Sequence, residues 1–231
     1  EAGNVIVLNA NELVINSVRV DGATAEFALH DETERLVITA PHTLQPGTAM
    51  LSISFTGTLN DKLRGFYRST YVDEAGVEQV IATTQMQSTD CRKAFPCWDE
   101  PDFKAVFGVS LIVNNDLMAL SNGPEVSRTA VDSHRSAVRF ADTMPMSTYL
   151  VAFIVGKLEA TAPVDVNGTP MRLVHVPGKA HLADFGLRVG AFSLKWFEDY
   201  YGIKYPGQKV DLVALPDFAA GAMENLGLIT Y

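Results

Sequence analysis

Short apolar runs separated by turn dipeptides dominate the chain up to about residue 176. Within residues 50–58, apolar side chains recur at every second position, which is the period of a strand with one buried face. Asp21-Gly22 and Asn167-Gly168 supply the positive φ angles that tight hairpin turns require. The strands predicted from these signals are 13–20, 23–29, 35–40, 50–58, 77–83, 103–113, 148–156, 161–166 and 171–176. Turns at this spacing predict a sandwich or a barrel-like pair of sheets.

The pattern changes after Pro177-Gly178. From residue 180 to residue 201, large apolar residues recur at steps of three and four, which predicts one face of a helix. That face consists of Leu182, Phe185, Val189, Phe192, Trp196 and Tyr200. Gly202 is a natural stop for this helix, and strands are expected at 210–215 and 226–231. We therefore expect a β-domain over residues 1–176, followed by an α+β unit over 177–231.

Composition narrows the classes of protein that the chain can represent. It has 231 residues, 47% of them apolar, and a net charge of −9. The acidic balance argues against nucleic acid as a partner, because nucleic acid requires a basic surface. No apolar run reaches the roughly 18 residues of a membrane span. The chain begins with Glu1 rather than Met and stops inside an apolar run at Tyr231, so we expect it to be a piece of a longer protein.

The chain contains two cysteines, Cys91 and Cys97. Two are too few for a disulfide framework in a chain of this length, so we expect buried free thiols. Sparse cysteine usage favours a reducing compartment, and we expect a cytoplasmic location.

Complete catalytic motifs are absent from the sequence. It has no HExxH, CxxC, GxSxG, P-loop or GxGxxG pattern, and its five histidines are scattered. We therefore expect no catalytic residue and no metal site in this chain. Two other segments could carry function, 84–101 and 215–225.

Segment 84–101 combines amide, charged, aromatic and proline residues, and its simplest interpretation is a polar loop held by its own ion pairs. Segment 215–225 contains a run of small residues, 219–222, with a single acid, Glu224, beside it. An acid in such a loop could bind a cation such as the α-ammonium group of a peptide. The alternative is an ordinary loop between strands with one solvated acid.

The sequence Gly221-Ala222-Met223-Glu224-Asn225 resembles the GAMEN exopeptidase motif of the M1 (gluzincin) zinc aminopeptidases. TQMQSTDCRKAFPCWDEP, at 84–101, resembles a second signature of that family. The runs FKAVFGVSLIV, MSTYLVAFIVGKLE and WFEDYYGIKYP also fit. The resemblance covers essentially the whole chain in order, and it is greatest to the puromycin-sensitive and aminopeptidase N-like branch.

The resemblance implies a mainly β fold. An N-terminal antiparallel β-sandwich or saddle-like domain would precede the α+β start of a thermolysin-like catalytic domain. In the family the zinc motif follows the point that matches Tyr231. The resemblance thus implies Zn²⁺ in the parent protein, with its ligands absent from this chain. It also implies that the fragment is inactive alone and that it packs against the remainder of its own catalytic domain.

The substrates implied are peptides with a free N-terminus. Glu224 matches the family acid that binds the α-amine. Gly221 and Ala222 match residues whose backbone groups pair with an extended substrate. Met223 and Asn225 belong to the motif and are expected to hold the loop.

Other residues of the expected site flank this motif. Ala220 would line the S1 pocket, and its small size would leave room for large side chains. Gln85 and Gln87 match the opposite side of the subsite, delivered by the β-domain. The segment 96–101 is expected to brace the two domains, and Arg92 to pair with a nearby acid.

One position departs from the commonest family pattern. Gln87 stands where many members carry Glu, whereas the leukotriene-hydrolase branch has Gln there. An amide still accepts a hydrogen bond from an ammonium group but brings no charge. Two alternatives therefore stay open beside the aminopeptidase, namely a non-catalytic M1-like scaffold and a bifunctional epoxide hydrolase/aminopeptidase.

Overall fold

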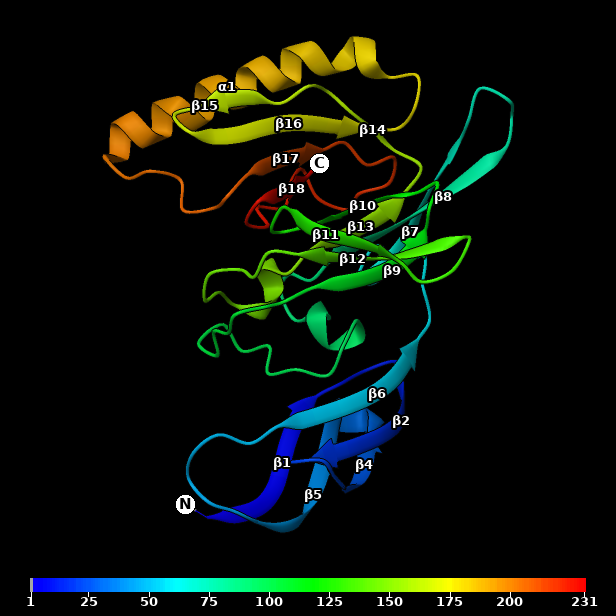
Figure 1. The fold of residues 1–231 in the computed structure, drawn as a ribbon, viewed down its shortest axis with the longest axis vertical. Helices are drawn as coiled ribbons and strands as arrows, with labels where there is room; N and C mark the ends of the chain where they lie inside the picture. The colour runs from blue at the N-terminus through cyan, green and yellow to red at the C-terminus, as the bar shows by residue number, and fades with distance from the viewer. Residues whose placement is uncertain (1) are drawn as a thin grey trace.

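The computed structural model describes residues 2–231 and is mainly β, as predicted from the sequence. Three layers follow one another along the long axis of the molecule (Figure 1). Strands β1–β6 form a lobe at the N-terminal end, β7–β13 form the middle layer, and β14–β18 form the last layer under a single long helix, α1. Within the described residues, no helix is both long enough and apolar enough to span a membrane.

The first lobe packs two three-stranded sheets, β1-β5-β4 and β3-β2-β6. Their bounds are β1 Gly3–Asn9, β2 Leu13–Val20, β3 Ala23–Thr24, β4 Glu26–His30, β5 Arg35–Leu44 and β6 Leu51–Gly57, with a 3₁₀ turn at Asp31–Thr33. Asp21 and Gly22 have φ angles of 50° and 83°, which confirms the predicted tight turn between β2 and β3. Strand β5 continues past Pro41, where a stop was expected, because the β1 register shifts between Gly3 and Val5 and an irregular ladder tolerates proline.

The middle layer contains the sheets β10-β13-β8-β7 and β11-β12-β9. Its strands are β7 Gly65–Val72, β8 Glu78–Gln85, β9 Ser110–Asn114, β10 Met118–Ser121, β11 Glu125–Ala130, β12 Arg135–Phe140 and β13 Phe153–Gly156; 3₁₀ turns lie at Asp90–Lys93 and Thr148–Leu150. Two predicted strands are shorter than expected. Residues 103–109 are irregular, and the apolar run 148–156 starts as a turn, because a short apolar run does not distinguish a strand from a buried loop.

The last layer is one mixed sheet, in which β14 Glu159–Ala160 and β15 Val164–Val166 pair antiparallel with β16 Thr169–His175. β16, β17 (Val210–Val213) and β18 (Leu228–Thr230) are parallel neighbours. This sheet therefore contains strands from both sides of the domain boundary expected after residue 176. The change from one sheet to the next along the chain falls between β13 and β14. Strands from both sides join through the β16–α1–β17 crossover, since a parallel pair needs a long connection that leaves the sheet and returns.

Helix α1 spans Ala180–Tyr201 and ends at Gly202, which has a left-handed φ of 65°, as predicted. The side of α1 that faces the sheet carries two glycines beside larger apolar residues such as Leu187. A Cβ added at Gly190 would lie 2.6 Å from Leu212 Cδ1, and one added at Gly186 would lie 3.0 Å from Leu173 Cδ1. The two glycines thus let the helix approach the sheet closely.

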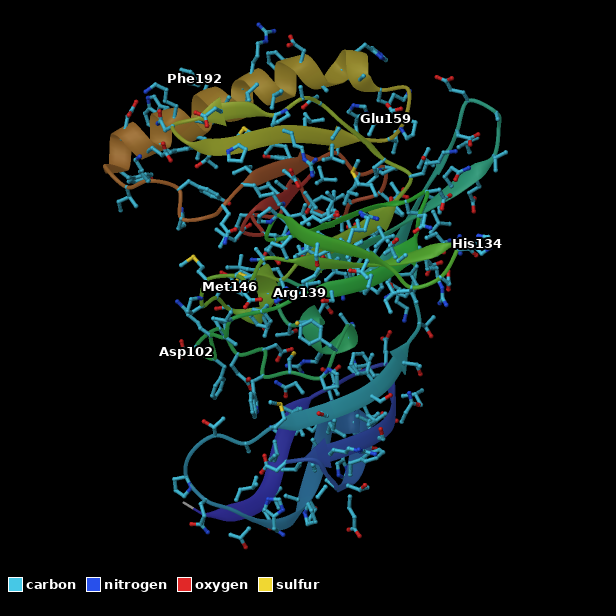
Figure 2. The ribbon with its side chains drawn as sticks, in the orientation of Figure 1. Asp102, His134, Arg139, Met146, Glu159 and Phe192 are labelled. Atoms are coloured by element: carbon cyan, nitrogen blue, oxygen red, sulfur yellow. The ribbon has the colours of Figure 1, made fainter. Side chains whose placement is uncertain are left out.

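The apolar face that predicted α1 is largely exposed, and two of its residues, Phe185 and Val189, border a groove between the helix and the sheet. Phe185 and Phe192 are 71% and 70% exposed, and Figure 2 shows Phe192 on the outer side of the helix. The other exposed members are Leu182, Val189, Trp196 and Tyr200. A contiguous apolar surface of this kind marks an interaction site rather than an ordinary solvated face.

Candidate functional site

The segment that contains Glu224 connects the parallel strands β17 and β18. It leaves the carboxyl end of β17, the end at which open α/β sheets usually bind their ligands. Within it, Met223 and Asn225 are 0% and 1% exposed, whereas Glu224 between them is exposed. Met223 exchanges two backbone hydrogen bonds with Thr230, at 2.8 and 3.1 Å.

The Asn225 side chain closes this loop from inside, because its Nδ2 donates to the carbonyl oxygen of Leu228 at 3.2 Å. Two buried neighbours therefore hold Glu224 outward. No described residue lies within ion-pair or hydrogen-bond distance of its carboxylate. Gly221 has no atom within 4 Å of an added Cβ, and Ala220 and Ala222 are exposed. The loop thus presents one free carboxylate and an accessible backbone.

Gln85 is the last residue of β8, where it pairs with Gly65 of β7. Gln85 is 9% exposed, and its Oε1 has no hydrogen-bond partner among the described residues. A buried carbonyl oxygen without a donor is costly, so this atom is an unsatisfied acceptor. Gln87, two residues further on, is exposed.

Strand β7 places Gln85 on the side of the molecule that holds the loop. Gly65 lies opposite Gln85, and two residues along β7 the Tyr67 hydroxyl donates to the carbonyl oxygen of Asp217 at 3.0 Å. Burial, followed by the nearby Asp217 carboxylate, raises the pKa of Tyr67, which keeps its hydroxyl protonated as a donor. Among the described residues, neither glutamine is hydrogen-bonded to Glu224. The structure therefore connects Gln85 to the loop only through strand β7.

Arg92 pairs with two acids, which confirms the expectation of an acidic partner. Its Nη1 lies 2.7 Å from Glu34, and its Nε and Nη2 lie 2.8 and 2.7 Å from the two oxygens of Asp99. The hydrogen bonds to Asp99, with those to Glu34, raise the pKa of Arg92 above its ordinary value. Asp99 is 1% exposed, so the ion pair is largely removed from water.

Residues 96–101, expected to brace the two domains, contact the first lobe in this structure, and bracing of the catalytic domain stays a prediction. Cys97 pairs with Asn9 of β1, and Trp98 Nε1 donates to the carbonyl oxygen of Val7 at 2.7 Å. These contacts join the first lobe to the middle layer, between which the segment lies (Figure 1). Cys91 and Cys97 are buried free thiols, as expected.

Within residues 2–231, no three His, Cys, Asp or Glu side chains gather closely enough to hold a metal ion. His175, for example, is 4% exposed, and its Nδ1 lies 2.8 Å from the carbonyl oxygen of Val176. The described residues therefore do not form a zinc site, and no chemical step is assigned to a metal here.

Sequence reasoning missed the residues that anchor the ends of the loop, Asn122, Lys209 and Asp217. Lys209 is 8% exposed and reaches Asp211 Oδ2 at 2.8 Å. Burial lowers the pKa of Lys209, an effect that Asp211 opposes. Asn122 and Asp217 act on partners more than one hundred residues away. No local pattern marks such pairs, because their partners are set by the packing of layers.

Comparison with known proteins assigns the family. The model described as "Peptidase M1 N-terminal domain" matches residues 1–150, and "Peptidase family M1 domain" matches residues 185–231. The chain belongs to the peptidase M1 family. This result confirms the resemblance carried by the segments 84–101 and 221–225.

Several curated relatives of the chain are named as aminopeptidases. Puromycin-sensitive aminopeptidase of Caenorhabditis elegans is 44% identical over 100% of the chain and 25% of its own length. Aminopeptidase 2 of Candida albicans is 43% identical over 100% of the chain and 25% of its own length. Aminopeptidase M1-B of Oryza sativa subsp. japonica is 44% identical over 98% of the chain and 26% of its own length. The chain thus spans about a quarter of the length of these relatives.

Proposed function

We propose that this chain is the N-terminal part of a zinc-dependent aminopeptidase that removes N-terminal residues from peptides, and that Glu224 binds the substrate α-ammonium group. The observation that supports this role is the exposed carboxylate of Glu224 between two buried loop residues. A hydrogen bond to a charged group contributes about 1.5–3 kcal/mol. An anchor of that strength would restrict cleavage to chain termini.

The other residues of the proposed subsite act beside this anchor. Gln85 accepts a hydrogen bond from the ammonium group through its unpaired Oε1, and Gln87 adds a neutral acceptor. The accessible backbone of Gly221 and Ala222 pairs with the extended peptide as an added strand does. Ala220, an exposed small residue, borders the S1 pocket.

The chemical step belongs to the part of the relatives' length that the chain does not span. We place the zinc ligands there, and we propose that residues 1–231 alone are inactive. A groove of about 560 Å³ between α1 and the sheet, lined by apolar residues such as Phe185, Val189 and Leu212, would receive further elements of the same peptidase domain. A cytoplasmic location stays a prediction, supported by the two free thiols.

Inhibition of the full-length protein by a peptide and by its N-acetylated form tests the role of Glu224. Glu224→Gln removes the charge but keeps the shape, and we expect it to weaken binding of the free-amine peptide about 10- to 100-fold, the ratio equivalent to 1.5–3 kcal/mol. Binding of the acetylated peptide should change little. Asp116→Asn, at another exposed acid, is the matched control.

An unchanged ratio between the two peptides in Glu224→Gln would remove Glu224 as the anchor. The 231-residue chain serves as the negative control for hydrolysis. Chelator-sensitive turnover of an aminoacyl-arylamide by that chain would contradict its proposed inactivity.

A further inference from the structure

Both ends of the loop that carries Glu224 are hydrogen-bonded to the middle layer. At the first end, the Asp217 Oδ2 accepts hydrogen bonds from Ser69 Oγ at 3.1 Å and from the Thr70 backbone N–H at 2.9 Å. The Asp217 backbone N–H donates to Ser69 Oγ at 3.0 Å. Ser69 is fully buried, so this end of the loop has one fixed position on strand β7.

Asn122, which follows β10, holds the second end. Its Nδ2 donates to the carbonyl oxygens of Leu226 and Leu150, both at 2.8 Å, and its Oδ1 accepts from the Ala152 N–H at 2.9 Å. Asn122 is 4% exposed. With both amide hydrogens and the oxygen engaged, its side chain has one favourable orientation. The carbonyl oxygen of Leu226 is therefore tied to the middle layer two residues after Glu224.

Gly227, which follows Leu226, completes the second attachment. Gly227 donates its N–H to the Tyr205 hydroxyl at 2.7 Å, and its carbonyl oxygen accepts from Lys209 Nζ at 2.7 Å. A Cβ at position 227 would lie only 2.2 Å from the Asn122 carbonyl oxygen. The backbone of the loop and the backbone of the middle layer are thus in direct contact at this point.

Between the two attachments, the four residues 219–222 are exposed. The position of Glu224 therefore depends on the two attached ends as well as on the buried neighbours Met223 and Asn225. We propose that Ser69 and Asn122 are positioning residues, through which the M1 N-terminal domain sets where the Glu224 carboxylate meets the substrate ammonium group. This inference rests on the proposed role of Glu224, but the attachment itself can be measured without a substrate.

Amide hydrogen exchange of residues 218–228 measures the attachment in the 231-residue chain. We expect Asn122→Ala to accelerate exchange in this segment about ten-fold or more, because the loop then opens without global unfolding. Ser121→Ala is the matched control. Ser121 is 1% exposed and its hydroxyl donates to the carbonyl oxygen of Ala152 at 2.9 Å, not to the loop.

If Asn122→Ala does not fold, Ser69→Ala tests the other end. It removes both side-chain hydrogen bonds to Asp217, and Ser69→Thr keeps the hydroxyl and should restore slow exchange. Equal exchange of the loop in Ser121→Ala and Asn122→Ala, or in Ser69→Thr and Ser69→Ala, would overturn the attachment. This outcome does not depend on Glu224.

A double-mutant cycle in the full-length protein then tests positioning. With Glu224 present, we expect Asn122→Ala to raise KM for a free-amine substrate by about ten-fold or more, because small misplacements of a binding group are costly. With Glu224→Gln already in place, Asn122→Ala should add little. Independent, multiplicative effects would overturn positioning through Glu224. Failure of Glu224→Gln alone to change KM would overturn the proposed function, while the exchange result would still decide the attachment.

Discussion

Substitution of Gly227 by alanine is the perturbation for which the structure gives the clearest magnitude. Gly227 has a φ of +78°, and its added Cβ would lie 2.2 Å from the Asn122 carbonyl oxygen and 3.4 Å from the Lys209 carbonyl oxygen. Ordinary contacts begin at about 3.4 Å, so the obstruction is the Asn122 carbonyl group, which belongs to the backbone. The loop must therefore move away from the middle layer.

Three costs follow from that movement. The left-handed conformation costs an alanine about 1–2 kcal/mol. Breaking the hydrogen bond to Tyr205 costs about 1 kcal/mol, and losing the charged bond from Lys209 costs about 1.5–3 kcal/mol. We therefore expect Gly227→Ala to lower the free energy of unfolding by about 3–6 kcal/mol. That is a large part of the total stability of a typical protein, which is about 5–15 kcal/mol.

Urea unfolding of the 231-residue chain, followed by tryptophan fluorescence, measures this loss. Gly221→Ala is the matched control in the same loop, because an added Cβ there meets nothing within 4 Å. We expect it to change the free energy of unfolding by less than about 1 kcal/mol. Equal midpoints for the two variants, at unchanged slope, would refute the reasoning that Gly227 is fixed by backbone contact.

Two further predictions concern the helix. The 231-residue chain should bind a hydrophobic dye through the outer face of α1. Phe192→Ser should therefore reduce dye fluorescence more than Val14→Ser, a control at a 63% exposed residue of the first lobe. Equal fluorescence for the two variants would contradict this prediction. Glu198 accepts hydrogen bonds from the Tyr205 N–H at 2.8 Å and from Asn167 Nδ2 at 2.6 Å, and these bonds, the first above all, lower the pKa of Glu198 below its ordinary value of 4.5. Because the folded-state pKa is depressed, its contribution to stability is present above about pH 4.5 and is lost as the pH falls through the lowered value. Glu198→Gln should therefore be less stable than the unaltered chain at pH 7, with a gap in thermal midpoint that narrows in acid, and a gap independent of pH would argue against this assignment.

Local signals predicted much of the fold. Asn167-Gly168 adopts φ angles of 52° and 94° and joins β15 to β16, as its composition indicates. The helix starts at Ala180 and stops at Gly202 because apolar spacing and a glycine terminator act within a few residues of one another. The candidate site could be proposed from the sequence because both of its motifs are contiguous, and its role stays a prediction.

The same spacing predicted the helix but left the environment of its apolar face undetermined. A three-and-four pattern predicts a helix with an apolar face, but it does not say which layer covers that face. In this structure the sheet contacts the side with Gly186 and Gly190, and the aromatic side stays exposed. The sheet also crosses the boundary expected after residue 176, because pairing of β16 with β17 depends on a chain reversal through α1.

By itself, the sequence determined the β-rich class, the helix, the hairpin turns and the likeness to M1 peptidases, because each depends on residues close together in the chain. Only the tertiary structure decided how Glu224 is held. The attachments through Ser69 and Asn122 join residues 148 and 104 positions apart in sequence. Such pairs form only when separate layers pack, since hydrogen-bond partners are chosen by distance in space and not by distance along the chain.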